Sequence, residues 1–336
     1  MTIKDLAAIT GYAVGTVSRA LNDHPNVSDK ARKAILQAAK EQGFQLNANA
    51  KQLKQSTSNT IAVIVKGTGN ELFAEMLEYI QPLIAKTRYQ LVVDYLDEDS
   101  NEVIRAVQLC REKKPVGILF LGGATQNFAA DFDKIDIPCV EVTNDASVLN
   151  FPNLSSVTTD DREAARRAID TLVEHGHRRI AVIGGDRNTS DVSRLRFEGC
   201  VQSFRDHGIP FDPDVDYQTI RFSCEEGYRA TRQLLEKGWD YTAIFAVSDV
   251  MTIGAIRALW EAGMKVPQDV SVIGLDGLAL GRYLVPQLST VKQDFRSIAL
   301  RSVHILLDSI EEDGTARHET VPFQVLISES IRSISK

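Results

Sequence analysis

From Thr60 onward, short apolar segments alternate with amphipathic ones, and this alternation restricts the possible folds more than any other feature of the chain. Residues 61–65 form a continuous apolar run, which is typical of a strand buried on both faces of a parallel sheet. Further strands are predicted at 90–95, 116–121, 139–143, 179–184, 217–222, 243–247, 270–274 and 320–327. Helices with one apolar face are predicted at 72–85, 101–112, 161–175, 193–207, 225–237, 250–262 and 295–312. The alternation starts again at Ser156, so we predict a doubly wound α/β unit that is used twice.

Residues 1–57 predict a separate, all-helical module. Thr2 opens a short helix and Asp5 follows three residues later, which is the spacing of a capping box, and Gly11 ends this helix. A third helix begins after the capping residue Ser28 and ends at Gly43. Its predicted buried residues are Ala31, Ile35 and Ala38. Three helices of this length predict a small trihelical module of the kind that binds DNA.

The second helix, predicted at 14–21, carries the surface expected to meet DNA. Its inward residues are Val17, Ala20 and Leu21. Its outward residues, spaced at i, i+3 and i+4, are Gly15, Ser18 and Arg19. This is the face of a helix–turn–helix that enters a major groove.

The charge distribution supports the same division of the chain. The whole sequence carries a net charge of −7. Residues 1–57 contain eight Lys and Arg against four Asp and Glu, a net charge of +4, which leaves −11 on the rest. A basic head joined to an acidic body is expected when only the head approaches phosphate groups.

The cysteines and the hydropathy of the chain indicate which cellular compartment the protein occupies and whether it binds a metal. The cysteines are scattered without metal-ligand spacing, and we expect buried thiols in a reducing compartment: Cys110, Cys139, Cys200 and Cys224. No apolar run is long enough to span a membrane, and a capped helix stands where a signal peptide would begin. The sequence therefore predicts a cytoplasmic protein with no membrane partner, no cofactor and no metal.

A short polar segment, 46–59, separates the head from the body, and we call it the hinge segment. It contains a helical pattern of about two turns followed by a Ser- and Thr-rich tail. A single helix this short is marginal in water because nucleation is costly. We expect it to fold only when DNA or a second copy of the chain holds it.

Several segments together resemble the lactose/galactose-repressor family of bacterial transcription regulators. The resemblance extends along essentially the whole chain, and the order and spacing of its parts are more specific than any one of them. The matching residues are 2–7, 16–22, 27–28, 47–53, 176–180 before a strand, 266–274 and 288–291.

This resemblance implies a small all-α helix–turn–helix head and an α/β body of two doubly wound lobes, like periplasmic binding proteins. It places the head at 1–45 and the hinge segment at 46–59. The N-terminal lobe is then 60–157 with 292–318, and the C-terminal lobe 158–291 with 319–336. Family members are dimers that bind near-palindromic operators, with a small effector held between the lobes.

By the same resemblance, DNA is contacted from the second helix and the hinge segment. The implied contact residues are Val14, Gly15, Thr16, Arg19, Asn22, Ala50, Lys51, Leu53 and Lys54. A guanidinium can bond guanine O6 and N7 together, so Arg19 is the expected base reader, the alternative being a contact to phosphate alone. Val14 could instead be part of the hydrophobic core of the head, which is the alternative to a DNA contact. Leu53 matches a leucine that wedges into the minor groove, and its alternative is packing against the body.

One departure from the family pattern concerns the start of the second helix. Ala13 stands where a capping serine is usual, which weakens that cap.

The resemblance also implies an effector site. Its residues are Asn70, Phe73, Asn144, Arg196, Phe222, Ser248, Asp276 and Gln293. Carboxylate, guanidinium and amide groups suit adjacent hydroxyls, and a phenyl ring suits a sugar face, so a sugar-like ligand is expected. The alternatives are a structural ion pair for Arg196 and a turn-capping carboxylate for Asp276. Residues 292–296 hint at a hexose or glycoside, whereas Ser248 and 274–277 depart from the common pattern and leave the sugar open.

Three other functions compete with a sugar-responsive repressor. Gly67 and Gly69 after a buried strand, with Asp94 ending the next strand, permit a nucleotide-dependent oxidoreductase, although Leu72 occupies the third glycine position. A regulator of the same architecture that responds to purines or nucleosides is the second alternative. A pure solute-binding protein would lack the DNA-binding head. No catalytic motif is present, so we do not expect an enzyme.

Overall fold

The computed structural model describes residues 2–21, 26–42, 44, 58–312 and 314–334. The chain forms two compact units, Met1–Ser58 and Asn59–Lys336, which we call the head and the body. Each unit is described separately.

The head consists of three short helices, α1 (Ile3–Thr10), α2 (Val14–Leu21) and α3 (Asp29–Glu41). The predicted capping box of α1 is confirmed, because Thr2 Oγ1 accepts from the Asp5 amide and the Asp5 carboxylate accepts from the Thr2 amide. Gly11 ends α1 in the left-handed conformation, with φ of 71°. Ser28 caps α3 as predicted. The helices enclose a core of fully buried side chains that includes Leu6, Val17, Ala20 and Ile35.

Two details of the head differ from the sequence-based expectation. In α3 the fully buried residue of the last turns is Ala39, and Ala38 is only partly buried. In α2, Leu21 at the helix end is likewise only partly buried.

The first lobe of the body is built on a six-stranded sheet with strand order β11-β5-β4-β3-β1-β2. All five strand pairs are parallel. The strands are β1 (Thr60–Lys66), β2 (Gln90–Leu96), β3 (Gly117–Leu121), β4 (Cys139–Val142), β5 (Leu154–Thr158) and β11 (His318–Thr320). The helices are α5 (Glu71–Ala85), α6 (Glu102–Glu112), α7 (Thr125–Asp131) and α13 (Phe295–Glu311), with short 3₁₀ turns at Phe132–Lys134 and Ser147–Leu149.

Strand β1 is buried on both faces, as its apolar run predicts. Ile61, Val63 and Val65 belong to the core on the side of α5 and α13. Ala62 and Ile64 belong to the core on the side of α6 and α7. The first lobe is therefore a three-layer α/β/α structure.

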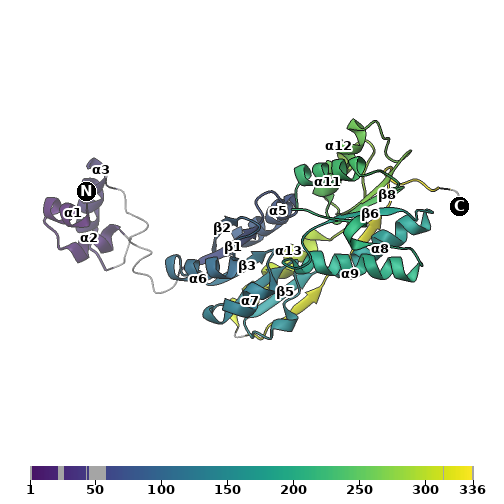
Figure 1. The fold of residues 1–336 in the computed structure, drawn as a ribbon. Helices are drawn as coiled ribbons and strands as arrows, with labels where there is room; N and C mark the ends of the chain where they lie inside the picture. Colours follow the sequence, from purple (N-terminus) through teal and green to yellow (C-terminus); the bar gives the residue numbers. More distant parts are fainter. Residues whose placement is uncertain (1, 22–25, 43, 45–57, 313, 335–336) are drawn as a thin grey trace. The chain divides into compact units, whose positions relative to one another are not determined.

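The second lobe repeats this design on a second six-stranded sheet, ordered β12-β10-β9-β8-β6-β7, in which only β12 is antiparallel to its neighbour. The strands are β6 (Ile180–Gly184), β7 (Tyr217–Thr219), β8 (Ala243–Ala246), β9 (Ser271–Asp276), β10 (Ser289–Lys292) and β12 (Gln324–Leu326). Helices α8 (Asp161–Glu174) and α9 (Asp191–Asp206) pack together on one face. Helices α11 (Cys224–Glu236) and α12 (Asp249–Glu261) pack on the other (Figure 1). The short elements are α10 (Pro213–Asp216) and the 3₁₀ turn η3 (Ala279–Tyr283).

The chain passes between the two lobes three times. It leaves the first sheet after β5 and returns to it through α13, directly after β10. It leaves again between β11 and β12. The two sheets with their flanking helices are the doubly wound unit used twice that the sequence predicts.

Two sequence-based element predictions are wrong in detail, and one helix of the first lobe was not predicted. The single terminal strand at 320–327 is in fact β11 and β12, two short strands in different sheets. Strand β7 ends at Thr219, because the residues after it leave the sheet and line the cavity described below. Helix α7, which begins at Thr125 and has seven residues, was not predicted, because it is too short to show a helical period.

Candidate functional site

A cavity of about 580 Å³ lies between the two lobes at the carboxyl ends of their parallel strands. Open α/β sheets bind ligands in this position. The structure brings six of the eight predicted effector residues to the wall of this cavity: Asn70, Phe73, Asn144, Arg196, Phe222 and Asp276. The other two, Ser248 and Gln293, lie behind the wall and hydrogen-bond to Asp276.

Asp276, the last residue of β9, is almost fully buried and holds a polar cluster together. Its carboxylate accepts from Ser248 Oγ at 2.6 Å and from Gln293 Nε2 at 2.9 Å, and Arg196 Nη2 lies 3.6 Å away. Arg196, on α9, donates to Asp161 Oδ1 at 2.7 Å and to the Val247 carbonyl. Burial raises the pKa of Asp276 and of Asp161, whereas the Arg196 guanidinium opposes that rise. Arg196 therefore has the ion pair that was its structural alternative, and it also faces the cavity.

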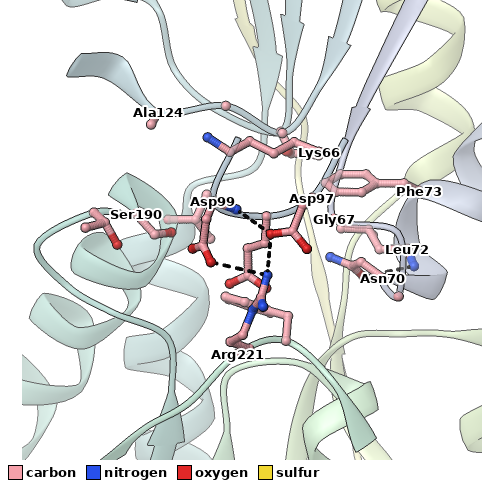
Figure 2. A pocket seen from close by; sticks show the side chains of 18 of the residues that line it. Lys66, Gly67, Asn70, Leu72, Phe73, Asp97, Asp99, Ala124, Ser190 and Arg221 are labelled. Atoms are coloured by element: carbon pink, nitrogen blue, oxygen red, sulfur yellow. Dashed lines mark hydrogen bonds and ion pairs between the residues drawn. The ribbon is translucent and has the colours of Figure 1, made fainter. Parts of the chain in front are cut away.

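The first lobe contributes an apolar ring and two amides. Phe73, on the first turn of α5, packs against Gly122, where a Cβ would lie 2.9 Å from the Phe73 Cζ atom. Asn70 caps α5 by accepting from the Leu72 amide, so its amide nitrogen is the group it can offer a ligand (Figure 2). Asn144 follows β4 and donates to the Gly123 carbonyl at 2.8 Å.

Two buried carboxylates behind this wall were not predicted from the sequence. Glu102, which opens α6, accepts from Lys66 Nζ at 2.6 Å and from the Ala124 amide at 2.7 Å. Glu141, on β4, accepts from Asn144 through Oε1, while its Oε2 has no hydrogen-bond partner among the residues that the structure describes. Burial, together with the nearby carboxylates of Glu102, Asp191 and Asp145, raises the pKa of Glu141 to about 8.

No local pattern marks these two carboxylates in the sequence. Lys66 and Glu102 are far apart along the chain, and Glu141 lies inside an otherwise apolar strand.

Carboxylates also bridge the two lobes around the cavity. Arg221, just after β7, pairs with Asp97, Glu98 and Asp99, which follow β2, with an Arg221 Nη2 to Asp97 Oδ1 distance of 2.7 Å (Figure 2). Elsewhere the Thr125 amide donates to Asp191, and the Ala279 amide donates to Glu75. An acidic run directly after the predicted strand at 90–95 was the sequence signal that could have indicated the Arg221 cluster.

The features that permitted an oxidoreductase do not assemble a nucleotide site. Asp94 forms an ion pair with Arg105 and does not line the cavity. Within the described ranges, no group of three or more His, Cys, Asp or Glu side chains is arranged to hold a metal ion. Among the same residues, no helix has the length and apolar character needed to cross a bilayer.

The cysteines differ from the sequence-based expectation of four buried thiols. Cys139 and Cys200 are buried and Cys110 is partly buried, but Cys224 is exposed where α11 begins.

In the head, the exposed side of α2 carries most of the predicted DNA-contacting residues of that helix. Val14 is 45% exposed, so its core alternative is wrong. Gly15 and Arg19 are exposed, and Arg19 Nε donates to the Gly15 carbonyl at 3.1 Å. Thr16 is partly buried. The remaining predicted DNA contacts lie outside the described residues: Asn22, Ala50, Lys51, Leu53 and Lys54.

Comparison with known families accounts for both units of the chain. Residues 2–47 match the model of the bacterial regulatory proteins of the lacI family. Residues 169–331 match the periplasmic binding protein-like domain.

Two relatives and two solved structures are similar along nearly the whole chain. The HTH-type transcriptional regulator MalR of Clostridium butyricum is 32% identical over 99% of this chain and 100% of its own length. The catabolite control protein A of Priestia megaterium is 28% identical over 90% of this chain and 91% of its own. A transcriptional regulator CelR–cellobiose complex has a TM-score of 0.72 at 25% identity, covering 98% of this chain and 99% of that one. A lac repressor dimer bound to operator and the anti-inducer ONPF has a TM-score of 0.75 at 25% identity, covering 99% of both chains.

These similarities overturn the oxidoreductase interpretation, because the matching family consists of regulators. The similarity to MalR extends over its whole length, and residues 2–47 match the DNA-binding family model. A pure solute-binding protein lacks this head, so that interpretation is wrong as well. The chain belongs to the lacI family of bacterial regulatory proteins, and it is a transcriptional regulator and not an enzyme.

Proposed function

We propose that this protein represses genes of carbohydrate metabolism by binding an operator through its head, and that a sugar-like effector in the interlobe cavity controls this binding. The observation that carries the proposal is a cavity lined by polar and aromatic side chains from both lobes, in a chain that also carries a helix–turn–helix. Relatives named MalR and ExuR, the latter from Bacillus subtilis, and the CelR–cellobiose complex support a sugar-related role.

The composition of the cavity wall supports a polyol as the ligand. Asp276, Arg196 and Asn144 present carboxylate, guanidinium and amide groups that bond to neighbouring hydroxyls. Phe73 and Phe222 offer apolar surfaces on which a sugar ring can stack. A small number of placed polar groups among apolar ones is the usual composition of small-molecule sites.

On the DNA side, we propose that Arg19 reads a base in the major groove. Val14 and Gly15 then lie close to the base edges of the same groove. Exposure of Arg19 on the outer face of α2 supports this role. We assign Leu53 to the minor groove, with Lys51 and Lys54 at phosphate, on the resemblance of the hinge segment alone.

We propose that the working form is a homodimer on a near-palindromic operator. The lac repressor with which the fold aligns is a dimer on its operator. The second lobe also exposes large apolar side chains around a hollow, with Trp260 at 66% and Val285 at 93% exposure. Aromatic residues of this kind are enriched in protein interfaces.

The proposed mechanism couples the cavity to the head through the hinge segments of the dimer. A ligand that changes the angle between the lobes changes the separation of the two hinge segments, and only one separation lets both fold on DNA. Coupling of this type typically amounts to about 1–3 kcal/mol, which is about a 5- to 150-fold change in operator affinity.

The proposal is tested in two steps. An operator is first selected from a random duplex library with the full-length protein, and thermal shift then screens neutral sugars, sugar phosphates and purine bases. Each hit is added to an operator gel shift. A sugar that stabilises the protein and changes operator affinity supports the proposal. A purine base that does so instead, or an operator affinity that no stabilising ligand changes, would contradict it.

A further inference from the structure

The charges that face the cavity carry information about the ligand beyond its hydroxyl groups. Among the described residues, three cationic side chains line the cavity: Lys66, Arg196 and Arg221. A phosphorylated or carboxylated ligand is commonly held by such a cation, or by a helix N-terminus, that is free to take its negative charge.

Each of these three cations is held by the protein's own carboxylates. Lys66 Nζ lies 2.6 Å from the fully buried Glu102. Arg221 faces three carboxylates, those of Asp97, Glu98 and Asp99.

Arg196 lies between Asp161 and Asp276, both buried. Burial raises the pKa of both carboxyls, yet even with one of them protonated this triad carries no net positive charge. Within the described ranges, each cation of the wall therefore already faces a carboxylate of the protein.

The helix ends that point toward the cavity are also occupied. Helix α5 is capped by Asn70 and has Glu71 in its first turn. Helix α9 is capped by Ser190 and has Asp191 there, and α11 is capped by Ser223 and has Glu225 and Glu226. The amides of Ala124 and Thr125 at the start of α7 donate to Glu102 and Asp191. At each of these ends, the protein's own acidic side chain lies in the first turn or accepts an amide, which offsets the positive end of the helix dipole.

From this arrangement we propose that the effector is an uncharged carbohydrate, and that the cavity rejects sugar phosphates and sugar acids. This inference rests on the proposed function and specifies the ligand class of the same site. The carboxylates of the wall outnumber the cations near them: Asp97, Glu98, Asp99, Glu225, Glu226 and Asp276 face the three cations of the wall and Arg229, which pairs with Glu225 and Glu226 from outside it. An anionic ligand meets net repulsion there, whereas hydroxyl groups meet carboxylate acceptors and guanidinium donors.

Isothermal titration of the full-length protein with matched sugar pairs tests the inference. The pairs are maltose and maltose 6-phosphate, cellobiose and cellobiose 6-phosphate, and glucose and glucuronate. We expect the neutral member of the binding pair to bind at least about tenfold more tightly than its anionic partner, because like charges within the cavity are only partly screened. Raising the salt concentration should narrow this gap. An anionic member that binds as tightly as its neutral partner would overturn the inference.

A double variant, Asp97→Asn with Asp99→Asn, tests the cause of the selectivity. Both side chains are well exposed, at 60% and 83%, so the fold should tolerate the change. With two charges removed beside Arg221, the ratio of anionic to neutral affinity should rise by about threefold or more. Asp240→Asn removes a carboxylate from the Arg179 pair, outside the cavity wall, and should leave the ratio unchanged.

An unchanged ratio in the double variant would overturn the charge argument. The protein could still bind its selected operator but bind neither member of any pair. This result would overturn the proposed sugar-sensing function and the inference with it. Tight binding of a sugar phosphate would overturn the inference alone.

Discussion

At the scale of single residues, Glu141 shows how burial changes the chemistry of a carboxyl. It lies inside β4, with one oxygen hydrogen-bonded to Asn144 and the other left without a partner in the described part of the chain. A buried charge without a partner is costly, and protonation is the cheaper state. Its pKa of about 8 stands well above the ordinary value of 4.5.

Glu141→Gln should therefore alter how stability depends on pH. Between pH 4.5 and about 8 the folded protein retains a proton that the unfolded chain has lost, so this group lowers the free energy of unfolding as pH rises. Glutamine mimics the protonated carboxyl and removes this dependence. Relative to wild type, the free energy of unfolding of the variant should rise by about 1.4 kcal/mol for each pH unit between 4.5 and about 8. Urea unfolding at pH 5 and pH 9 measures the difference.

Glu78→Gln, on the exposed side of α5, removes a carboxylate of the same kind from the surface and serves as the control. A Glu141→Gln stability difference that is the same at both pH values would show that Glu141 is ionised throughout.

Arg19→Lys tests the base-reading role proposed for α2. Lysine keeps the charge but loses the bidentate fork, so the preference for the selected operator over a single-base variant at the contacted position should fall by about 1–3 kcal/mol. Fluorescence anisotropy with both duplexes measures this preference. Lys40→Arg, near the end of α3, is a matched control. Equal loss of affinity for both duplexes would assign Arg19 to phosphate.

The site itself could be predicted only in part, and the missing residues share a reason. Arg196 and Asp276 were predicted because they stand at positions matched to a known family. Their partner Asp161, and the Lys66–Glu102 pair, are set by packing between segments distant in the sequence. Such pairings have no periodicity or spacing to reveal them.

At the scale of elements, helix starts follow their caps closely. Side chains cap the helices α1, α3, α5, α6, α8, α9, α11 and α13, and the sequence predicted all of these helices to within a few residues. The helices that were missed are the short ones: α7, of seven residues without a side-chain cap, and α10, of four residues capped by Asp212, are too short to show a helical period. Prediction of the terminal strand also failed, because nothing local shows that the chain changes sheets between Thr320 and Gln324.

Ala13→Ser should stabilise α2. The Ala13 carbonyl already accepts the first backbone bonds of this helix, but its methyl group cannot accept from an exposed amide. A serine cap is worth about 1 kcal/mol. Amide hydrogen exchange in the full-length protein should show slower exchange across 14–21.

Ala34→Ser, on the exposed side of α3, is the control. It places a serine inside a helix and should give no such protection. Unchanged exchange in α2 would mean that another group already caps it.

At the scale of the whole body, a few polar contacts hold the two lobes against each other around the cavity. The Arg221 cluster is the most highly charged of them, and it is exposed. Exposed ion pairs contribute little singly, but removal of Arg221 leaves Asp97, Glu98 and Asp99 to repel one another and the acidic start of α11.

Arg221→Ala should therefore favour a wider separation of the lobes. Effector affinity should fall by about threefold to fivefold, and the loss should shrink at high salt. Small-angle X-ray scattering should show a larger radius of gyration for the variant. Arg301→Ala breaks the Arg301–Glu319 pair within the first lobe and should change neither quantity. Equal affinity and radius in Arg221→Ala and wild type would mean that the cluster does not hold the lobes.

The three passages of the chain between the lobes have a consequence for synthesis. Helix α13 covers β3, β4 and β5 of the first sheet, yet it leaves the ribosome only after β10 of the second lobe. Until then, the apolar face of the first sheet that α13 will cover stays exposed on the nascent polypeptide, while more than a hundred further amino acids are translated. Co-translational chaperones should dwell on that surface, and a message truncated just before codon 295 should yield an insoluble product.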